Sequence, residues 1–104
     1  MIRAIIWRAA AQADLVDLYD WIAREAGADV AWNYTSAIEA HAAKLIQLPH
    51  WGGAREDLGP GIRTISYRRR TTLAYRILAD AIEIVRLAHA GRDLGRMFTA
   101  EDDG

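Results

Sequence analysis

The spacing of hydrophobic positions changes early in the chain. Residues 2–7 are apolar and rich in β-branched side chains, which predicts a short strand. From Ala10 the apolar positions fall at steps of three and four, the period of an amphipathic helix. We expect this helix to end at Gly27, because glycine readily takes the left-handed conformation that closes a helix. Its apolar positions are Leu15, Leu18, Tyr19, Ile22 and Ala26.

A second helix is predicted directly after the first. Asp29 is expected at its N-cap, since a short acidic side chain can accept the free N–H groups of a first turn. Pro49 should stop it, because proline lacks an N–H group. The short gap between the two helices predicts an antiparallel helical hairpin. The apolar line of the second helix is Tyr34, Ile38, His41, Leu45 and Leu48.

The second half of the chain is typical of strands. Residues 49–61 form a loop punctuated by glycine and proline. Three strand-like runs follow, and their short connections predict an antiparallel meander. These runs are Ile62–Tyr67, Thr72–Leu78 and Ile82–His89. The next segment, Arg92–Phe98, is expected to dock back on the sheet. Its apolar residues are Leu94, Met97 and Phe98.

The order of elements is β-α-α-β-β-β, which predicts an α+β fold. In this fold an antiparallel sheet is packed on one face by an N-terminal helical hairpin. The other face is then either solvated or reserved for a partner. We expect a single domain over residues 1–98, followed by a short acidic tail at 99–104 that frays.

Composition narrows the class of protein. The chain contains no cysteine, which excludes disulfides, thiolate nucleophiles and cysteine-based zinc sites. The first residues lack the pattern of a signal sequence and no stretch is long enough for a membrane span, so we expect a cytoplasmic protein. The formal net charge of −1 argues against a general nucleic-acid binder.

The charges are unevenly placed along the chain. Acidic residues crowd the first third and arginines crowd the rest, and 12 of the 13 basic residues are arginine. Arginine is the better fork for carboxylates and phosphates. The second half is therefore expected to present a basic face to an acidic partner. Codon bias toward arginine is the alternative explanation of this excess.

Three arginines, Arg63, Arg76 and Arg86, lie within the predicted strands. A charge inside a strand must reach water, form a pair or serve a ligand. These residues form either a phosphate- or carboxylate-binding patch on the open face of the sheet, or solvated and salt-bridged positions on it. Strict alternation places Arg86 on the same side as Ile84 and Ala88. Because the register is not determined, whether the three arginines converge stays open.

Other side chains are also candidates for function. His89, at the end of the last strand, could act as a general acid or base near neutral pH, or could hold the tail by a hydrogen bond. Trp32 should point away from the apolar line of its helix, either as an interface anchor or packed under the chain. No pair of histidines has metal-ligand spacing, so we expect no metal and no cofactor. A row of acids on the first helix is expected to be solvated, namely Asp14, Asp17 and Asp20.

Several segments occur in an order and spacing that are together fairly specific. They are 13–23 on the first helix, the end of the second helix at 48–49, and the strand segments 61–63, 75–77 and 82–93. In this succession the chain resembles the RelE/ParE superfamily of bacterial toxins. The similarity runs from about Ile5 to Phe98 and agrees with the fold expected above.

The resemblance implies a type II toxin–antitoxin system, in which an antitoxin wraps the toxin. RelE-like members of the superfamily cut mRNA on the ribosome without a metal, whereas ParE-like members poison DNA gyrase. This chain is more similar to the ParE branch. It is poor in lysine, its net charge is slightly negative, and its tail has Met97 and Phe98 where several ribonucleases carry tyrosine or histidine.

The resemblance thus implies a toxin that inhibits DNA gyrase and is neutralised by a ParD-like antitoxin of the ribbon-helix-helix type. No catalytic residue is established on this hypothesis, and direct nucleic-acid binding is not expected outside the target complex. The alternatives are a RelE-like ribosome-dependent endoribonuclease and a non-toxic relative that acts as a scaffold. The ribonuclease candidates are Arg63, Arg76, Arg86 and His89. The residues expected to bind the antitoxin are Trp32, Arg63, Tyr75, Arg76, Arg86 and Arg92.

Overall fold

The computed structural model describes residues 1–103 of the chain, with side chains from 1 to 98. The elements follow the predicted order, with a short additional strand before the meander and a further helix after the last strand. The strands are β1 (Ala4–Trp7), β2 (Gly53–Ala54), β3 (Arg63–Tyr67), β4 (Thr71–Ile77) and β5 (Ala81–His89). The helices are α1 (Ala9–Ala26), α2 (Ala28–Ala43) and α3 (Leu94–Asp103), and short 3-10 turns cover Lys44–Ile46 and Glu56–Leu58.

The strands form one sheet in the order β1-β5-β4-β3-β2. β3, β4 and β5 make the predicted antiparallel meander, and β1 joins its β5 edge in parallel. The parallel pairing follows from the chain path. The helical hairpin returns the chain to the end where β1 began, so β3, and therefore β5, run in the same direction as β1.

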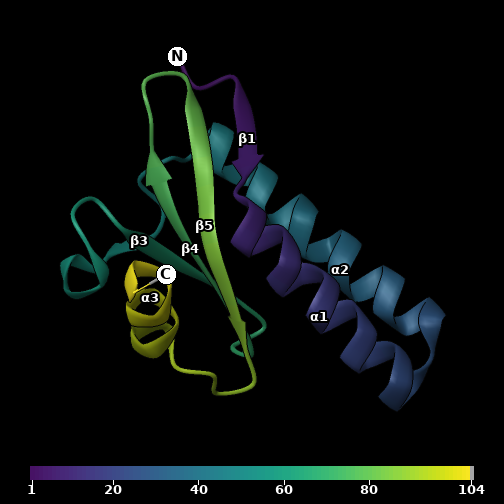
Figure 1. Cartoon of the computed structure of the whole chain (residues 1–104). Coiled ribbons are helices and arrows are strands. Elements are labelled where there is room, and N and C mark those ends of the chain that lie inside the picture. Colours follow the sequence, from purple (N-terminus) through teal and green to yellow (C-terminus); the bar gives the residue numbers. More distant parts are fainter. Residues whose placement is uncertain (104) are drawn as a thin grey trace.

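The molecule has a helical hairpin on one face of the sheet and α3 on the other (Figure 1). The α+β fold with a hairpin-packed sheet is therefore confirmed. The first core joins α1 and α2 to the sheet and includes Leu18, Ile38, Leu45, Leu73, Tyr75 and Ile82. The second core lies under α3 and includes Leu58, Ile62, Val85, Ala88, Leu94 and Met97. Docking of the tail is confirmed, so the tail covers part of the face expected to be solvated or reserved for a partner.

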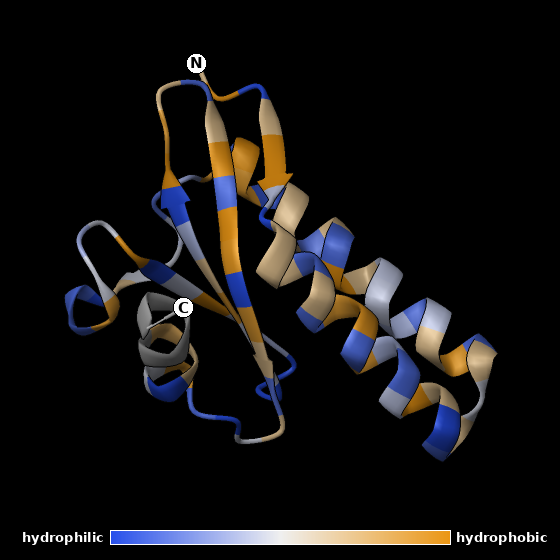
Figure 2. Cartoon of the chain, viewed as in Figure 1, coloured by the Kyte–Doolittle hydropathy of each residue, from blue (hydrophilic) through white to orange (hydrophobic). Residues whose placement is uncertain are grey.

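A bulge in β5 changes which side chains face which core. Hydrophobic and hydrophilic residues alternate along the strand (Figure 2), but its pairing with β4 shifts by one residue at Val85. As a result Ile84 lies in the core under the hairpin and Ala88 in the core under α3. The prediction that Arg86 shares one face with both is wrong, because strict alternation does not survive a bulge.

The boundaries of the helices differ from the prediction in two places. α2 begins at Ala28, so Asp29 lies in its first turn and not at its N-cap. Gly27 both closes α1 and precedes α2, with a φ of 102° that few other residues adopt. After Ala43 the chain tightens into a 3-10 turn, which changes the period and leaves Leu48 exposed instead of on the apolar line.

The loop between α2 and β3 contains an element that the sequence pattern missed. Its residues Gly53 and Ala54 form β2 and pair with the edge of β3. A strand of two residues is too short to show alternation, so only the pairing reveals it.

The backbone of α3 continues to Asp103 and so includes most of the predicted acidic tail. The side chains after Phe98, and Gly104 entirely, lie outside the described residues, so a domain boundary at residue 98 stays a prediction. In the part of the chain that the structure describes, no helix combines the length and apolar character that a membrane span requires.

Candidate functional site

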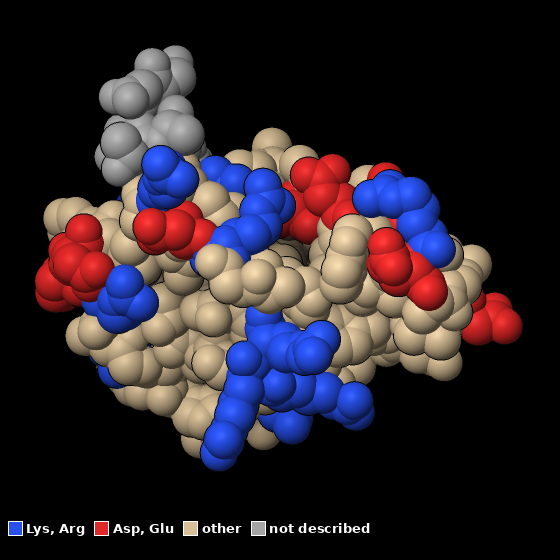
Figure 3. Space-filling view, turned by 90° about the horizontal axis from the view of Figure 1, so that it is seen from below, with Lys and Arg blue, Asp and Glu red and all other residues tan. Residues whose placement is uncertain are grey.

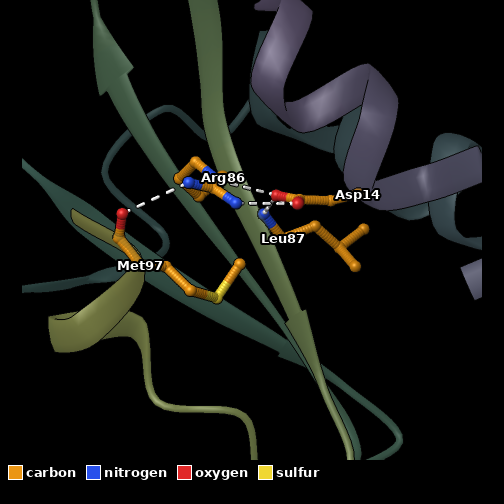
Figure 4. A network of polar contacts seen from close by, with 4 residues as sticks. All are labelled: Asp14, Arg86, Leu87 and Met97. Carbon is orange, nitrogen blue, oxygen red and sulfur yellow. Dashed lines mark hydrogen bonds and ion pairs between the residues drawn. The ribbon is translucent and has the colours of Figure 1, made fainter. Parts of the chain in front are cut away.

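A buried ion pair ties α1 to β5 and α3 (Figure 4). The guanidinium of Arg86 donates to both carboxylate oxygens of Asp14, at 2.8 and 2.9 Å. One of these oxygens also accepts the backbone N–H of Leu87 at 2.9 Å, and Arg86 reaches the carbonyl of Met97 at 3.2 Å. Because β1 ends at Trp7, this stretch of β5 has β4 on one edge and no strand on the other in the described part of the chain. On that open edge the Asp14 carboxylate accepts the N–H that a further strand would bind.

The prediction that Asp14 is solvated is wrong, since only 6% of its side chain is exposed. Helical spacing grouped it with Asp17 and Asp20, which are exposed on α1 and have no such partner among the described residues. Packing against β5 turns only Asp14 inward. Arg86, at 16% exposure, is held by α1 and α3, so contact with an external ligand would have to compete with its internal partners.

Arg63 and Tyr75 support the loop before β2. The guanidinium of Arg63 donates to the carbonyls of Gly52 and His50, at 2.8 and 3.2 Å. The fully buried hydroxyl of Tyr75 donates to the carbonyl of Pro49 and accepts from the N–H of Gly52, both at 2.8 Å. A Cβ at Gly52 would lie 2.7 Å from the Tyr75 ring, so this close approach requires glycine.

Replacing Tyr75 with phenylalanine should lower the free energy of unfolding by about 1–3 kcal/mol, because two buried loop groups lose their partner. Urea denaturation measures this loss. Tyr19→Phe is the control, since the Tyr19 hydroxyl makes no hydrogen bond within the described residues. An equal loss in both variants would contradict the assignment.

The strand arginines do not converge on one point. Arg63 lies beside Tyr75 at the loop, because the two residues are register partners on β3 and β4. Arg76 forms a cross-strand ion pair with Glu83 at 2.8 Å, next to a hollow beneath α3. Arg86 is held by Asp14 of α1, at the edge of β5 that faces away from β4. Arg76 and Arg86 therefore occupy salt-bridged positions, which is one of the two alternatives considered for the strand arginines.

His89 lies on the hairpin side of the sheet and is bonded to its neighbours. Its Nδ1 is 2.7 Å from the Thr71 hydroxyl, which in turn is 2.9 Å from the hydroxyl of Tyr34 on α2. Burial lowers the pKa of the imidazole below its ordinary value, and the charge of Arg70 lowers it further. The lowered pKa favours the neutral ring at neutral pH. The side-chain hydrogen bond of His89 goes to Thr71 on β4 and not to the tail.

The lowered pKa of His89 predicts a loss of stability in mild acid. Below its ordinary pKa of about 6.5 the unfolded chain takes up a proton more readily than the folded chain. Stability is thus unaffected by this group at higher pH and falls as the pH drops toward the lowered pKa. Unfolding in urea at about pH 7 and pH 5.5 should show a smaller loss for His89→Gln than for the unmodified protein. An identical loss would contradict this cause.

A row of aromatic rings crosses the seam between the hairpin and the sheet. Neighbouring ring centroids along it are 4.9 to 5.8 Å apart. Edge-to-face and tilted contacts of this kind are favourable for rings. The row runs through Trp21, His89, Tyr34, Tyr67, His41 and Trp51. Sequence reasoning missed it, because its members come from both helices, two strands and a loop. His41, which belongs to the predicted apolar line of the second helix, is half-buried in the row and donates to the carbonyl of Ser66.

A groove of about 400 Å³ opens at one end of this row, between α1 and β5. The N–H of Ala90 donates toward β4, to the carbonyl of Arg70. Since backbone groups alternate along a strand, those of Leu87 and His89 point the opposite way, toward the groove. Its floor is thus a strand edge that no other strand pairs in the described part of the chain. The lining includes Asp17, Leu18, Trp21, Arg24, His89 and Arg92.

The residues expected to bind a partner are spread over several surfaces. Arg92 lines the groove, and Trp32 is 66% exposed on the outer side of α2, as its helical position predicted. Tyr75 is fully buried. Sequence reasoning missed the groove, because neither Trp21 nor the edge of β5 belongs to a sequence motif.

Comparison with known proteins places this chain in a family. Residues 5–94 match the family model described as "ParE toxin of type II toxin-antitoxin system, parDE". The structure is similar to a chain of the "Chromosomal ParDE TA system from P. aeruginosa", with a TM-score of 0.74 and 26% sequence identity, over 86% of this chain and 97% of that one. No curated protein matches the sequence. Because the family model spans most of its length, the chain belongs to the ParE toxin family and is the toxin of a type II toxin–antitoxin system, in which its partner is an antitoxin.

Proposed function

We propose that this toxin acts in the cytoplasm, inhibits DNA gyrase, and is neutralised by a ParD-like antitoxin of the ribbon-helix-helix type. Membership of the ParE family supports the gyrase target. One observation favours it over ribonuclease activity: the candidate catalytic residues Arg63, Arg76, Arg86 and His89 are bound to separate partners and are divided between the two faces of the sheet.

Cleavage of RNA by the 2′-hydroxyl requires a base, an acid and positive charge within reach of one phosphate. His89 faces the helical hairpin, whereas Arg76 pairs with Glu83 next to the hollow beneath α3. One feature still supports the ribonuclease alternative. His89 is neutral and lines the same groove as Arg92, so a base and a cation lie along one surface.

We propose the groove between α1 and β5 as the main site for the antitoxin. The Leu87 N–H is bound to Asp14 and the His89 carbonyl to the N–H of Arg92, so the Leu87 carbonyl and the His89 N–H are the edge groups that suit an added strand. Trp21 and Leu18 line the groove beside this edge and suit apolar side chains. Arg92 and Arg24 would then meet the acidic residues of the antitoxin. Arg63, Tyr75 and Arg86 contribute indirectly, by holding the sheet and the loop in shape. Trp32 and Arg76 lie on other surfaces and would be reached by a longer antitoxin segment.

The target is tested by a supercoiling and DNA-cleavage assay with purified gyrase, run beside cell-free translation with the same toxin. We expect gyrase-dependent cleaved DNA and intact translation. Blocked translation, with mRNA cut in the ribosomal A site, would overturn the gyrase proposal and favour the ribonuclease alternative. Addition of the antitoxin should abolish the gyrase effect.

A further inference from the structure

The turn between β3 and β4 carries arginines in an unfavourable backbone conformation. The N–H of Arg70 donates to the carbonyl of Tyr67 at 3.2 Å, which closes a tight turn around Arg68 and Arg69. These two residues have φ values of 53° and 59°. Both lie in the left-handed region, where turns of this type favour glycine and asparagine. Local backbone preference therefore does not explain arginine at both positions, and such outliers point to function.

These arginines have no acidic partner among the described residues, unlike three other arginines of the second half. Elsewhere in the second half, Arg55, Arg76 and Arg86 pair with Asp57, Glu83 and Asp14. In the described part of the chain no carboxylate pairs with Arg68, Arg69, Arg70 or Arg92, and all four are exposed. We call these four residues the arginine end. Arg68 rests over the ring of Tyr67, with its guanidinium carbon 5.5 Å from the ring centroid.

The arginine end surrounds a hollow of about 360 Å³. Arg69, Arg70 and Arg92 line it together with Arg55. The acid on its wall, Asp93, accepts the N–H of Gly95 at the start of α3. In the view from below, toward the end of the sheet where the β3–β4 turn lies in Figure 1, basic side chains gather in a central cluster set apart from the acidic ones (Figure 3). The surface is therefore locally positive on a chain whose net charge is −1.

We propose that the arginine end binds the phosphate backbone of duplex DNA. The inference rests on the proposed function, in which the target is a complex of gyrase with DNA, and it adds that the toxin touches the DNA itself. Arginine forks match phosphate oxygens in pairs.

A protein partner fits this surface less well than DNA. Protein interfaces depend on large apolar or aromatic anchors at their centre. The apolar residues that line the hollow, Ala88 and Leu94, are buried, and none of the exposed large hydrophobic residues lines it. Phosphate contacts need no such anchor, because charge supplies most of the affinity. Because the rest of the chain carries a net negative charge, the toxin binds DNA weakly and in one orientation. Contacts to phosphates imply no preference for base sequence.

The test is fluorescence anisotropy of a short labelled DNA duplex, titrated with the whole toxin at several salt concentrations. Three or four phosphate contacts predict a slope of about −3 in the plot of log affinity against log salt. The double variant R69Q/R70Q should lose at least about tenfold in affinity at low salt, and its slope should shrink by about 2. R69K/R70K, which keeps both charges, should retain most of the binding.

The matched control is R3Q/K44Q, which removes two exposed charges from other parts of the surface. It should bind DNA nearly as well as the unmodified toxin, and circular dichroism should be the same for all variants. Any one of four outcomes would overturn the inference. The toxin could show no salt-dependent binding to DNA, it could bind duplex RNA but not DNA, or the control R3Q/K44Q could weaken binding as much as R69Q/R70Q does. Weaker antitoxin binding by R69Q/R70Q with unchanged DNA binding would overturn it in favour of an acidic protein.

Failure of this inference can be told apart from failure of the proposed function. Binding to the duplex needs no gyrase, so it can be observed even if gyrase is not the target. If R69Q/R70Q traps cleaved DNA with gyrase as well as the unmodified toxin does, the DNA contact is wrong and the proposed function stands. If the unmodified toxin has no effect on gyrase but binds DNA through these arginines, the proposed gyrase target is wrong and the DNA contact stands.

Discussion

The Asp14→Ala variant should lose about 3–5 kcal/mol in the free energy of unfolding, the effect of removing one partner from a buried ion pair. The change leaves the Arg86 guanidinium without its carboxylate at 16% exposure and removes the acceptor of the Leu87 N–H. The change also releases α1 from the edge of β5 that no strand covers in the described part of the chain. A loss of this size is a large share of the total stability of a small domain.

Urea denaturation of Asp14→Ala and Asp17→Ala measures this effect. Asp17 is the control, because it lies one turn further along α1 and is exposed. Its replacement should change stability by less than about 0.5 kcal/mol. A double variant that also replaces Arg86 with methionine should recover part of the loss, since no unpaired charge stays buried. Losses of similar size at Asp14 and Asp17 would show that the pair contributes little.

Trp21→Ala should weaken antitoxin binding by at least about 30-fold, which corresponds to a loss of about 2 kcal/mol. Trp21 is 41% exposed and lines the groove beside the free edge of β5. Its other side packs against the ring of His89. A large ring that is held in place and half-exposed loses little freedom on binding, which is why such residues dominate interfaces.

Calorimetry with the purified antitoxin measures the affinity, and Trp51→Ala is the matched control. Trp51 is 45% exposed and packs against His41 at the opposite end of the aromatic row, away from the groove. Its replacement should leave the affinity within about threefold, because residues outside the centre of an interface contribute little. If Trp51→Ala or Trp32→Ala weakens binding more than Trp21→Ala does, the antitoxin lies on another surface.

Much of the fold was predictable because it depends on local spacing. Steps of three and four along α1 and β-branched runs along β3, β4 and β5 identify these elements from near neighbours alone. Short connections then leave few arrangements other than a helical hairpin on a meander. The family followed from the same order of segments, and the match over residues 5–94 confirms it.

The candidate site was less predictable, because its residues are distant in the chain. Arg86 was identified as unusual within a strand, but its partner Asp14 lies 72 residues away on α1. The aromatic row and the groove likewise join segments that share no motif. Arg68 and Arg69 belong to the arginine-rich second half of the chain, yet only the backbone shows that both adopt left-handed angles.

The sequence by itself determined the main elements, their order and the family, because periodicity and turn residues act over a few positions. Only the tertiary structure decided which charges are buried and which are free. A one-residue bulge at Val85 and the early end of β1 at Trp7 set where each side chain of β5 points and which part of its edge stays open. Such features depend on how distant segments pack, and packing is decided by the whole chain at once.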